Sequence, residues 1–131
     1  TMIYLSIPYT GCEDLSFRVS CAVLDKLIRA GNVAISTVVC GHAMRLQGRV
    51  DKSDYGLWIG YDLKILRDCD ALIVVKLDGW ENSAGVKAEM NEARSLGIPI
   101  IYLDPDWFVP YYVMDKWLSS DKNERLAEIT E

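Results

Sequence analysis

The stretch LDGWENSAGVKAEM, residues 77–90, contains a glutamate, Glu89, whose carboxylate is a candidate catalytic group. Val86, Met90 and Ala93 follow at helical spacing and predict a face that packs on a sheet. Glu89 falls on the flank of that face, in the N-terminal half of the helix, where the helix dipole favours an ionised carboxylate. It would be a carboxylate aimed at a cleft. The plainer alternative is a solvated glutamate paired with a basic neighbour on the helix.

Small residues precede this carboxylate and would let a ligand come close to the backbone. Gly79, Ser83 and Gly85 lie around the expected start of the helix, where free N–H groups could hold a phosphate or a sugar hydroxyl. Ser83 could equally be an ordinary N-cap. The GWENSAG segment therefore does not identify a ligand site by itself.

Apolar periodicity predicts the elements that must position these residues. The expected strands are 2–7, 33–39, 70–77 and 98–103, and the expected helices are 14–30, 55–67, 84–96 and 111–119, with a long loop over 45–54. Alternation of strand and helix predicts one doubly wound α/β domain over 1–131, flavodoxin-like or Rossmann-like, with a parallel sheet of about four to five strands flanked by helices. Residues 104–131 would form a helical extension.

Ligands in such folds bind beyond the carboxyl ends of the strands. The end of the first strand carries Ser6, Pro8 and Tyr9. His42, the only histidine, is expected in a loop after strand 33–39, where it could contact a phosphate or a base, or could be an ordinary surface histidine.

Aromatic residues at these strand ends are candidates for stacking on a base. Tyr9, Trp80 and Trp107 could each do so, although each could equally fill the core or contact a second subunit.

Composition limits the classes of function. The net charge of -5 provides no basic field, so binding of long nucleic acid is not expected, while a small anionic ligand needs only local donors. Four cysteines without CxxC spacing are typical of reduced thiols in a cytoplasmic protein, and no apolar run is long enough to span a membrane. Cys12, Cys40 and His42 lack the spacing of a metal site, so no metal is expected. No G-x-S-x-G, P-loop or G-x-G-x-x-G motif occurs.

Three segments, taken in order, resemble the nucleoside 2-deoxyribosyltransferase superfamily. They are YLSIPY at 4–9, YDLKILRDCDALIVV at 61–75 and DGWENSAGVKAEMNEARSLGIPIIYL at 78–103. The resemblance is closest to a small, functionally uncharacterised bacterial and phage branch of this superfamily and to its 2′-deoxynucleoside 5′-phosphate N-hydrolases. It covers most of residues 2–103.

The resemblance implies roles for particular residues. Glu89 matches the family's nucleophile, which forms a glycosyl–enzyme ester, and Asp62 matches the aspartate that handles the base or the proton of the leaving group. Tyr4 matches a tyrosine that orients the nucleophile. Read without the resemblance, Asp62 could be an exposed helix acid beside Lys64, and Tyr4 could belong to the core.

The resemblance also implies a substrate. Ser83 stands near the position where the nucleotide hydrolases have a serine and the free-nucleoside transferases have an acid, and this favours a 5′-phosphate because an acid would repel it. The expected activity is cleavage or transfer at the N-glycosidic bond of a (2′-deoxy)nucleoside 5′-monophosphate, without a cofactor and in a homodimer or higher homo-oligomer. The alternatives are a non-catalytic protein that binds a nucleotide or nucleotide-derived signal, and an NAD-type glycohydrolase.

Overall fold

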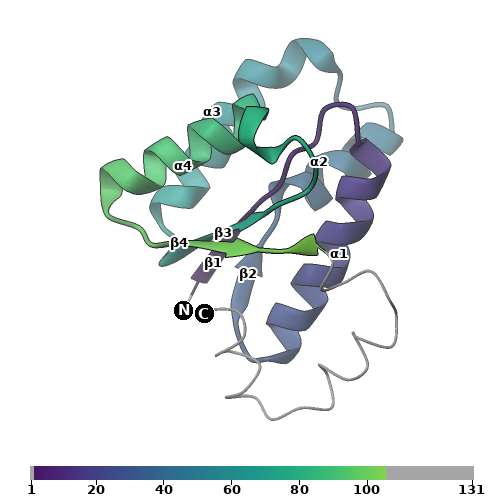
Figure 1. Cartoon of the computed structure of the whole chain (residues 1–131). Coiled ribbons are helices and arrows are strands. Elements are labelled where there is room, and N and C mark those ends of the chain that lie inside the picture. Colours follow the sequence, from purple (N-terminus) through teal and green to yellow (C-terminus); the bar gives the residue numbers. More distant parts are fainter. Residues whose placement is uncertain (1, 106–131) are drawn as a thin grey trace.

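A computed structural model describes residues 2–105, in which parallel strands alternate with helices (Figure 1). The strands are β1 (Met2–Ser6), β2 (Val33–Ile35), β3 (Ala71–Val75) and β4 (Ile100–Leu103). The helices are α1 (Glu13–Arg29), α2 (Thr37–Leu46), α3 (Tyr55–Arg67) and α4 (Ala84–Leu96), with 3-10 turns η1 (Lys52–Asp54) and η2 (Trp80–Asn82). The predicted α/β class is confirmed. The expected helix 111–119 and Trp107 lie outside the described residues.

The four strands form one parallel sheet in the order β2-β1-β3-β4. Tyr4 of β1 stands opposite Ile35 of β2 on one side and opposite Leu72 of β3 on the other. The chain therefore goes from β1 outward to β2 and then crosses back to β3. This reversal makes the carboxyl ends of β1 and β3 the expected place for a ligand.

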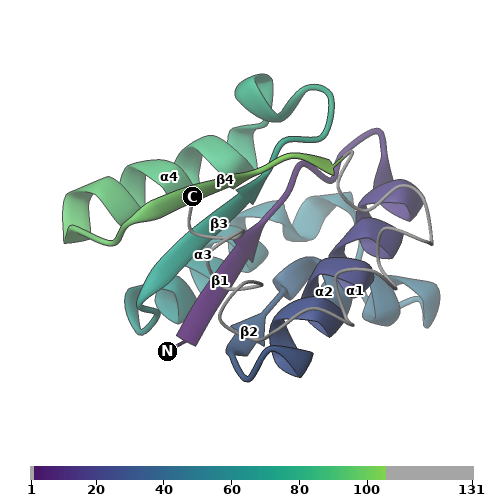
Figure 2. The same cartoon turned by 60° about the horizontal axis from the view of Figure 1, so that its bottom comes forward.

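Two apolar cores cover the two faces of the sheet. Ile3 and Leu5 of β1 belong to the core that contains the buried side chains of α1, whereas Tyr4 belongs to the core that contains those of α3 and α4. This alternation follows from the period of two along a strand. Figure 2 shows the sheet between α3 and α4 on one side and α1 and α2 on the other. None of the helices within 2–105 has the length and apolar character needed to cross a membrane.

The predicted strand 33–39 is wrong beyond Ile35. Ser36 caps a new helix, because its hydroxyl oxygen accepts a hydrogen bond from the Val39 backbone N–H at 3.2 Å, and α2 begins at the next residue. The β-branched run Thr37–Val39 favours a strand by propensity, but the cap and the packing of Val38 against the core of α1 prevail.

The same correction moves His42 out of the expected loop and into α2. It also takes the first residues of the expected loop 45–54 into the helix, while η1 takes up its last residues. Side chains of α2 therefore point from a fixed helical surface, which a loop would not provide.

Helix α4 has the bounds that the sequence predicts, and both ends are capped. The Ser83 hydroxyl oxygen accepts a hydrogen bond from the Val86 backbone N–H at 3.3 Å. Gly97 ends the helix at φ 70°, in the left-handed region that favours glycine. These caps fix the register of α4, and with it the face on which Glu89 lies.

Candidate active site

Glu89 is a buried carboxylate held by two hydroxyl groups of β1. Its side chain is 6% exposed, the Tyr4 hydroxyl donates to Oε2, and the Ser6 hydroxyl donates to Oε1 at 2.8 Å. Both donors lie on one face of the sheet because they are two residues apart on a strand. The alternative of a solvated glutamate, which the sequence left open, is therefore excluded for Glu89.

Asp62 lies beside this group on α3 and is half-buried. Its Oδ1 atom is buried and has no hydrogen-bond partner among residues 2–105. The charge of Asp62 acts directly on both Glu89 and Tyr4, so the two carboxyls belong to one site. The alternative of an exposed helix acid does not describe Asp62.

Thr37, the first residue of α2, lies against Tyr4. Its Oγ1 lies 3.1 Å from the Tyr4 hydroxyl oxygen, and the Thr37 hydroxyl lowers the pKa of Asp62. The sequence did not indicate this residue, because the prediction placed it inside a strand. The signal that could have found it is Ser36, since a serine before an apolar stretch is a helix N-cap.

Burial sets the protonation of this cluster. Burial raises the pKa of Glu89 to about 8, and the nearby charge of Asp62 adds to the effect, while the hydrogen bonds from Tyr4 and Ser6 oppose it. Burial also raises the pKa of Asp62 to about 6, opposed by the hydrogen bond of Thr37. Between about pH 6 and about pH 8, the pair therefore carries one proton and one negative charge.

The pKa of Tyr4 is raised far above its ordinary value, first by burial and then by the charge of Glu89. Tyr4 therefore keeps its proton at neutral pH and remains a hydrogen-bond donor. A neutral carboxyl beside an ionised one is the arrangement that separates an acid from a nucleophile. In the major form of this pair the proton lies on Glu89, which has the higher pKa, and in its minor form the proton lies on Asp62.

A second group forms around His42, which is buried at 7% exposed. The Phe17 ring stacks on the imidazole with centroids 4.4 Å apart, and the Tyr9 hydroxyl oxygen lies 2.7 Å from its Nδ1. Arg45 Nη1 donates to the same Tyr9 oxygen at 3.4 Å. The structure thus brings Tyr9 and His42 together, although His42 lies on α2 and not in the expected loop after a strand, and it adds Arg45, which the sequence placed in a loop.

The remaining predicted site residues lie near the ends of β1 and β3. Pro8 is buried just after β1, and its carbonyl accepts a hydrogen bond from the thiol of Cys12. Gly79 has φ 89° and precedes η2, a conformation that favours glycine. A Cβ on Gly85 would meet no atom within 4 Å, so the first turn of α4 is open there. Ser83 serves as the N-cap already described.

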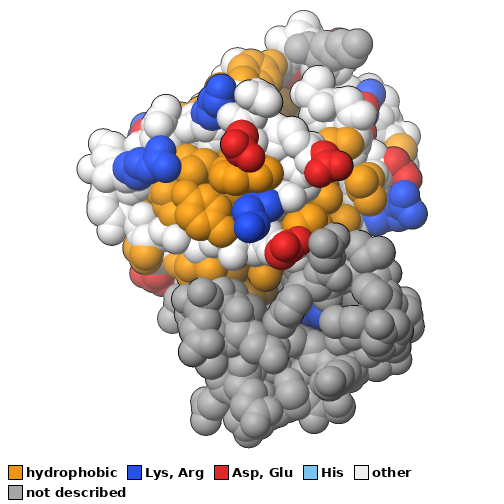
Figure 3. Space-filling view, viewed as in Figure 1, with side chains coloured by type: hydrophobic (Ala, Val, Ile, Leu, Met, Phe, Trp, Pro, Cys, Tyr) orange, Lys and Arg blue, Asp and Glu red, His pale blue; other side chains and the backbone are white. Residues whose placement is uncertain are grey.

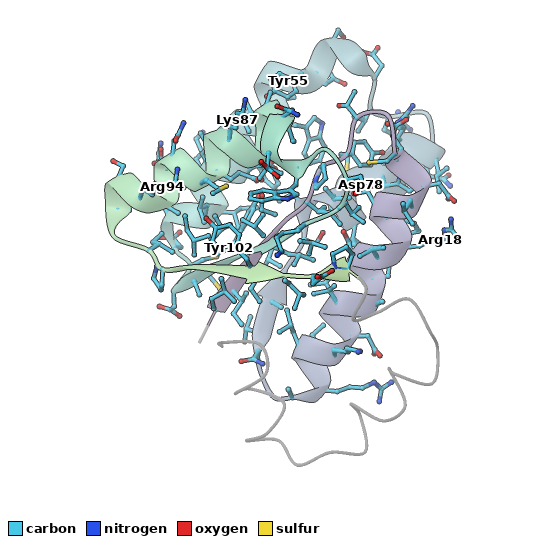
Figure 4. All side chains as sticks on the ribbon, in the orientation of Figure 1. Arg18, Tyr55, Asp78, Lys87, Arg94 and Tyr102 are labelled. Carbon is cyan, nitrogen blue, oxygen red and sulfur yellow. The ribbon has the colours of Figure 1, made fainter. Side chains whose placement is uncertain are left out.

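Trp80 lies at a hollow on the outer side of α4. The hollow has a volume of about 220 Å³ and is lined by Trp80, Glu81, Lys87, Met90, Asn91 and Arg94. The Trp80 ring also meets the ring of Tyr102 on β4, with centroids 5.6 Å apart. Figure 3 shows apolar side chains with basic ones beside them on this face, and Figure 4 labels Lys87, Arg94 and Tyr102 there. Trp80 therefore lines this hollow.

The described part of the chain contains no cluster of three or more His, Cys, Asp or Glu side chains able to hold a metal ion. Cys12, Cys40 and His42 thus do not form such a group. All four cysteines are free thiols.

Comparison with known proteins supports the fold. A 2-deoxyribosyltransferase from the psychrotolerant bacterium Bacillus psychrosaccharolyticus has a similar structure, with a TM-score of 0.61 at 20% sequence identity over 95% of this chain and 89% of that one. At that identity the likeness establishes the architecture alone. No curated protein matches the sequence. Residues 1–104 match the family described as a domain of unknown function, DUF1937, and the chain belongs to that family.

Proposed function

We propose that this protein cleaves or transfers the N-glycosidic bond of a (2′-deoxy)nucleoside 5′-monophosphate through a covalent glycosyl–Glu89 intermediate. The observation that carries the proposal is the buried Glu89 carboxylate, fixed by two hydroxyl donors beside a second carboxyl whose pKa is raised to about 6. The structural likeness to a 2-deoxyribosyltransferase supports N-glycosidic chemistry on this fold.

The reactive form is the minor form of the pair, with Glu89 ionised and the shared proton on Asp62, because the pKa values favour the proton on Glu89. In the first step, an ionised Glu89 oxygen attacks the anomeric carbon of the sugar. The bond from that carbon to the base nitrogen breaks, and its electron pair leaves with the base, which takes a proton from Asp62. The product is a sugar ester of Glu89 and an ionised Asp62. The positive charge that develops on the sugar is stabilised by the carboxylate before the new bond closes.

In the second step, water or another base attacks the same carbon and releases Glu89. Asp62 takes the proton of the attacking group, which restores the starting protonation of the pair. Water as the acceptor gives hydrolysis, and a second base gives transfer. Tyr4 and Ser6 keep both Glu89 oxygens in place through both steps, so the carboxylate need not reorient.

The substrate's phosphate would lie at the carboxyl ends of β1 and β3. The N-terminus of α4, with Ser83 and the open Gly85, offers backbone N–H groups, and Tyr9, which follows β1 and contacts His42, adds polar atoms at the end of β1. These are the residues we propose for substrate contact, in a homodimer or higher homo-oligomer that requires no cofactor.

The test is release of free base from 2′-deoxynucleoside 5′-monophosphates, measured by chromatography, with matching free nucleosides and NAD as competing substrates. Glu89→Ala should abolish release, and mass spectrometry should detect the glycosyl ester on the wild-type protein alone. Glu92→Gln is the matched control, because Glu92 lies on the same helix and pairs with Arg67 at the surface. Nicotinamide release from NAD, or stoichiometric binding with no base released from any substrate, would refute the proposal.

A further inference from the structure

The hollow on the outer side of α4 lies apart from Glu89. Two of its lining residues, Lys87 and Asn91, each stand two positions from Glu89 on the helix. Two positions turn a helix by about 200°, so these side chains point away from the side that Glu89 presents to β1. The hollow has a volume of about 220 Å³, and the proposed N-glycosidic chemistry makes no use of it.

One wall of the hollow is an aromatic surface that is held in place. Trp80 packs against the core of α3 and α4, and its ring meets that of Tyr102 with 5.6 Å between centroids. Its backbone N–H donates to the Leu77 carbonyl at 2.9 Å, and its carbonyl accepts from the Ser83 N–H at 3.3 Å. Met90, which is 7% exposed, adds an apolar surface to the same hollow. A planar ring can therefore stack on a preformed apolar wall.

Two basic side chains of the lining have no acidic partner among residues 2–105. Lys87 and Arg94 are both exposed, and neither forms an ion pair with a described carboxylate. They stand seven positions apart on α4, about 10 Å along the helix axis, with Asn91 between them. Figure 4 labels both on this helix. In a chain with a net charge of -5, these two cations provide a local attraction for an anion.

The polar groups of the lining narrow the class of ligand. Glu81 is exposed beside Trp80, and its carboxylate accepts hydrogen bonds but repels a bare anion. Asn91 can both donate and accept. A nucleotide suits this set, because it combines a flat ring, N–H or amino groups on that ring, and a phosphate. Inorganic phosphate lacks the ring, and a simple aromatic carboxylate lacks the N–H groups.

We infer that this hollow is a nucleotide-binding site separate from Glu89, in which the base stacks on Trp80 and the phosphate lies against Lys87 and Arg94. Pockets that enclose whole drug-sized ligands start at about 300 Å³. With about 220 Å³, the hollow takes the base and leaves the phosphate at its rim, where both cations are exposed. Binding here is independent of the proposed cleavage.

The experiment is an NMR titration that follows the indole N–H signal of Trp80, assigned with Trp80→Phe, as adenosine 5′-monophosphate is added. Adenosine, inorganic phosphate and phenylacetate are the comparison probes. We expect a saturable shift with the monophosphate, which should bind at least about fivefold more tightly than each comparison probe. Glu89→Gln, which cannot form the glycosyl ester, should give the same dissociation constant. Absence of a saturable shift, or equally tight binding of phosphate or phenylacetate, would overturn the site.

Substitutions in the lining test the same binding constant. Trp80→Ala should weaken binding of the monophosphate by at least about fivefold, through loss of the stacking surface. Lys87→Gln and Arg94→Gln should each weaken it by about two- to fivefold and reduce its dependence on salt. The matched control is Arg18→Gln, because Arg18 is an exposed cation on α1 that pairs with Asp14 (Figure 4).

The control should bind as the wild type does, and thermal unfolding checks that each variant is folded. Equal binding constants in Lys87→Gln, Arg94→Gln and Arg18→Gln would overturn the site, even where Trp80→Ala fails to fold. Absence of base release from the wild type would refute the proposed function, and the titration would still decide whether the hollow binds a nucleotide.

Discussion

Replacing Glu89 by glutamine should stabilise the protein at alkaline pH. The folded state holds the pKa of Glu89 at about 8 against an ordinary value of 4.5, so the folded protein retains a proton that the unfolded chain has lost. Stability is therefore full below about pH 4.5 and falls as the pH rises toward 8. At about 1.4 kcal/mol for each pH unit, the loss amounts to about 5 kcal/mol.

Glutamine removes that loss, because it cannot ionise and fits the same space. Its amide oxygen can accept from one of the hydroxyls of Tyr4 and Ser6, and its amide N–H can donate to the oxygen of the other. Glu89→Gln should therefore have nearly wild-type stability at about pH 4.5 and exceed the wild type by several kcal/mol above about pH 8. Asp62 titrates in both proteins and contributes a smaller slope to each.

The assay is urea denaturation followed by tryptophan fluorescence at a series of pH values, since the free energy of unfolding extrapolates linearly with urea. Glu92→Gln controls for the loss of a carboxylate on α4 and should follow the wild-type curve above about pH 5, apart from a small constant offset for its exposed ion pair. Parallel curves for wild type and Glu89→Gln across this range would refute the assignment of a buried carboxyl with a raised pKa to Glu89.

Three further outcomes follow from the same geometry. The pH dependence of kcat/KM should be bell-shaped, with its maximum between about pH 6 and about pH 8. Below this range both carboxyls are protonated and no nucleophile remains, and above it neither carboxyl can donate a proton. A rate that keeps rising or falling through this range, without a maximum, would contradict the shared proton. Asp62→Asn should slow base release by about 10²-fold or more, measured by steady-state kinetics, and an unchanged rate would exclude Asp62 as the acid. Ser83→Ala should lower the free energy of unfolding by about 1 kcal/mol in urea denaturation, through loss of the N-cap bond to Val86.

Periodicity was sufficient to predict most of the fold. Helices α3 and α4 have the bounds predicted from the sequence, because their apolar spacing is clear and Gly97 marks the end of α4. The buried run of β3 was equally plain. The prediction failed at residues 36–42, where β-branched residues form a helix. Local propensity there competes with a serine cap and with packing against α1, and packing cannot be read from a single sequence.

The site was predictable only where residues share an element or a strand end. Glu89 could be predicted because its position on a helical face follows from the residue spacing. Tyr4 and Ser6 could be placed on one face because they are two residues apart on a strand. Thr37 could not be predicted as a site residue, because its contact with Tyr4 depends on the direction in which α2 leaves the end of β2. Burial of Glu89 was also not predictable, since the helix flank it occupies is covered by other elements of the fold.

The cost of burying Glu89 bears on why the site is built as it is. A solvated glutamate on α4 would leave the domain more stable at neutral pH, yet water would then compete with Tyr4 and Ser6 for its oxygens. Removing water strengthens every electrostatic interaction in the site, including the attraction between the carboxylate and positive charge that develops on a sugar. A Glu89→Gln protein that is more stable and inactive would therefore connect the two effects, because the same burial would account for both the lost stability and the chemistry. A Glu89→Gln protein that gained stability while retaining base release would separate them, and Glu89 would then be a buried carboxyl without a catalytic role.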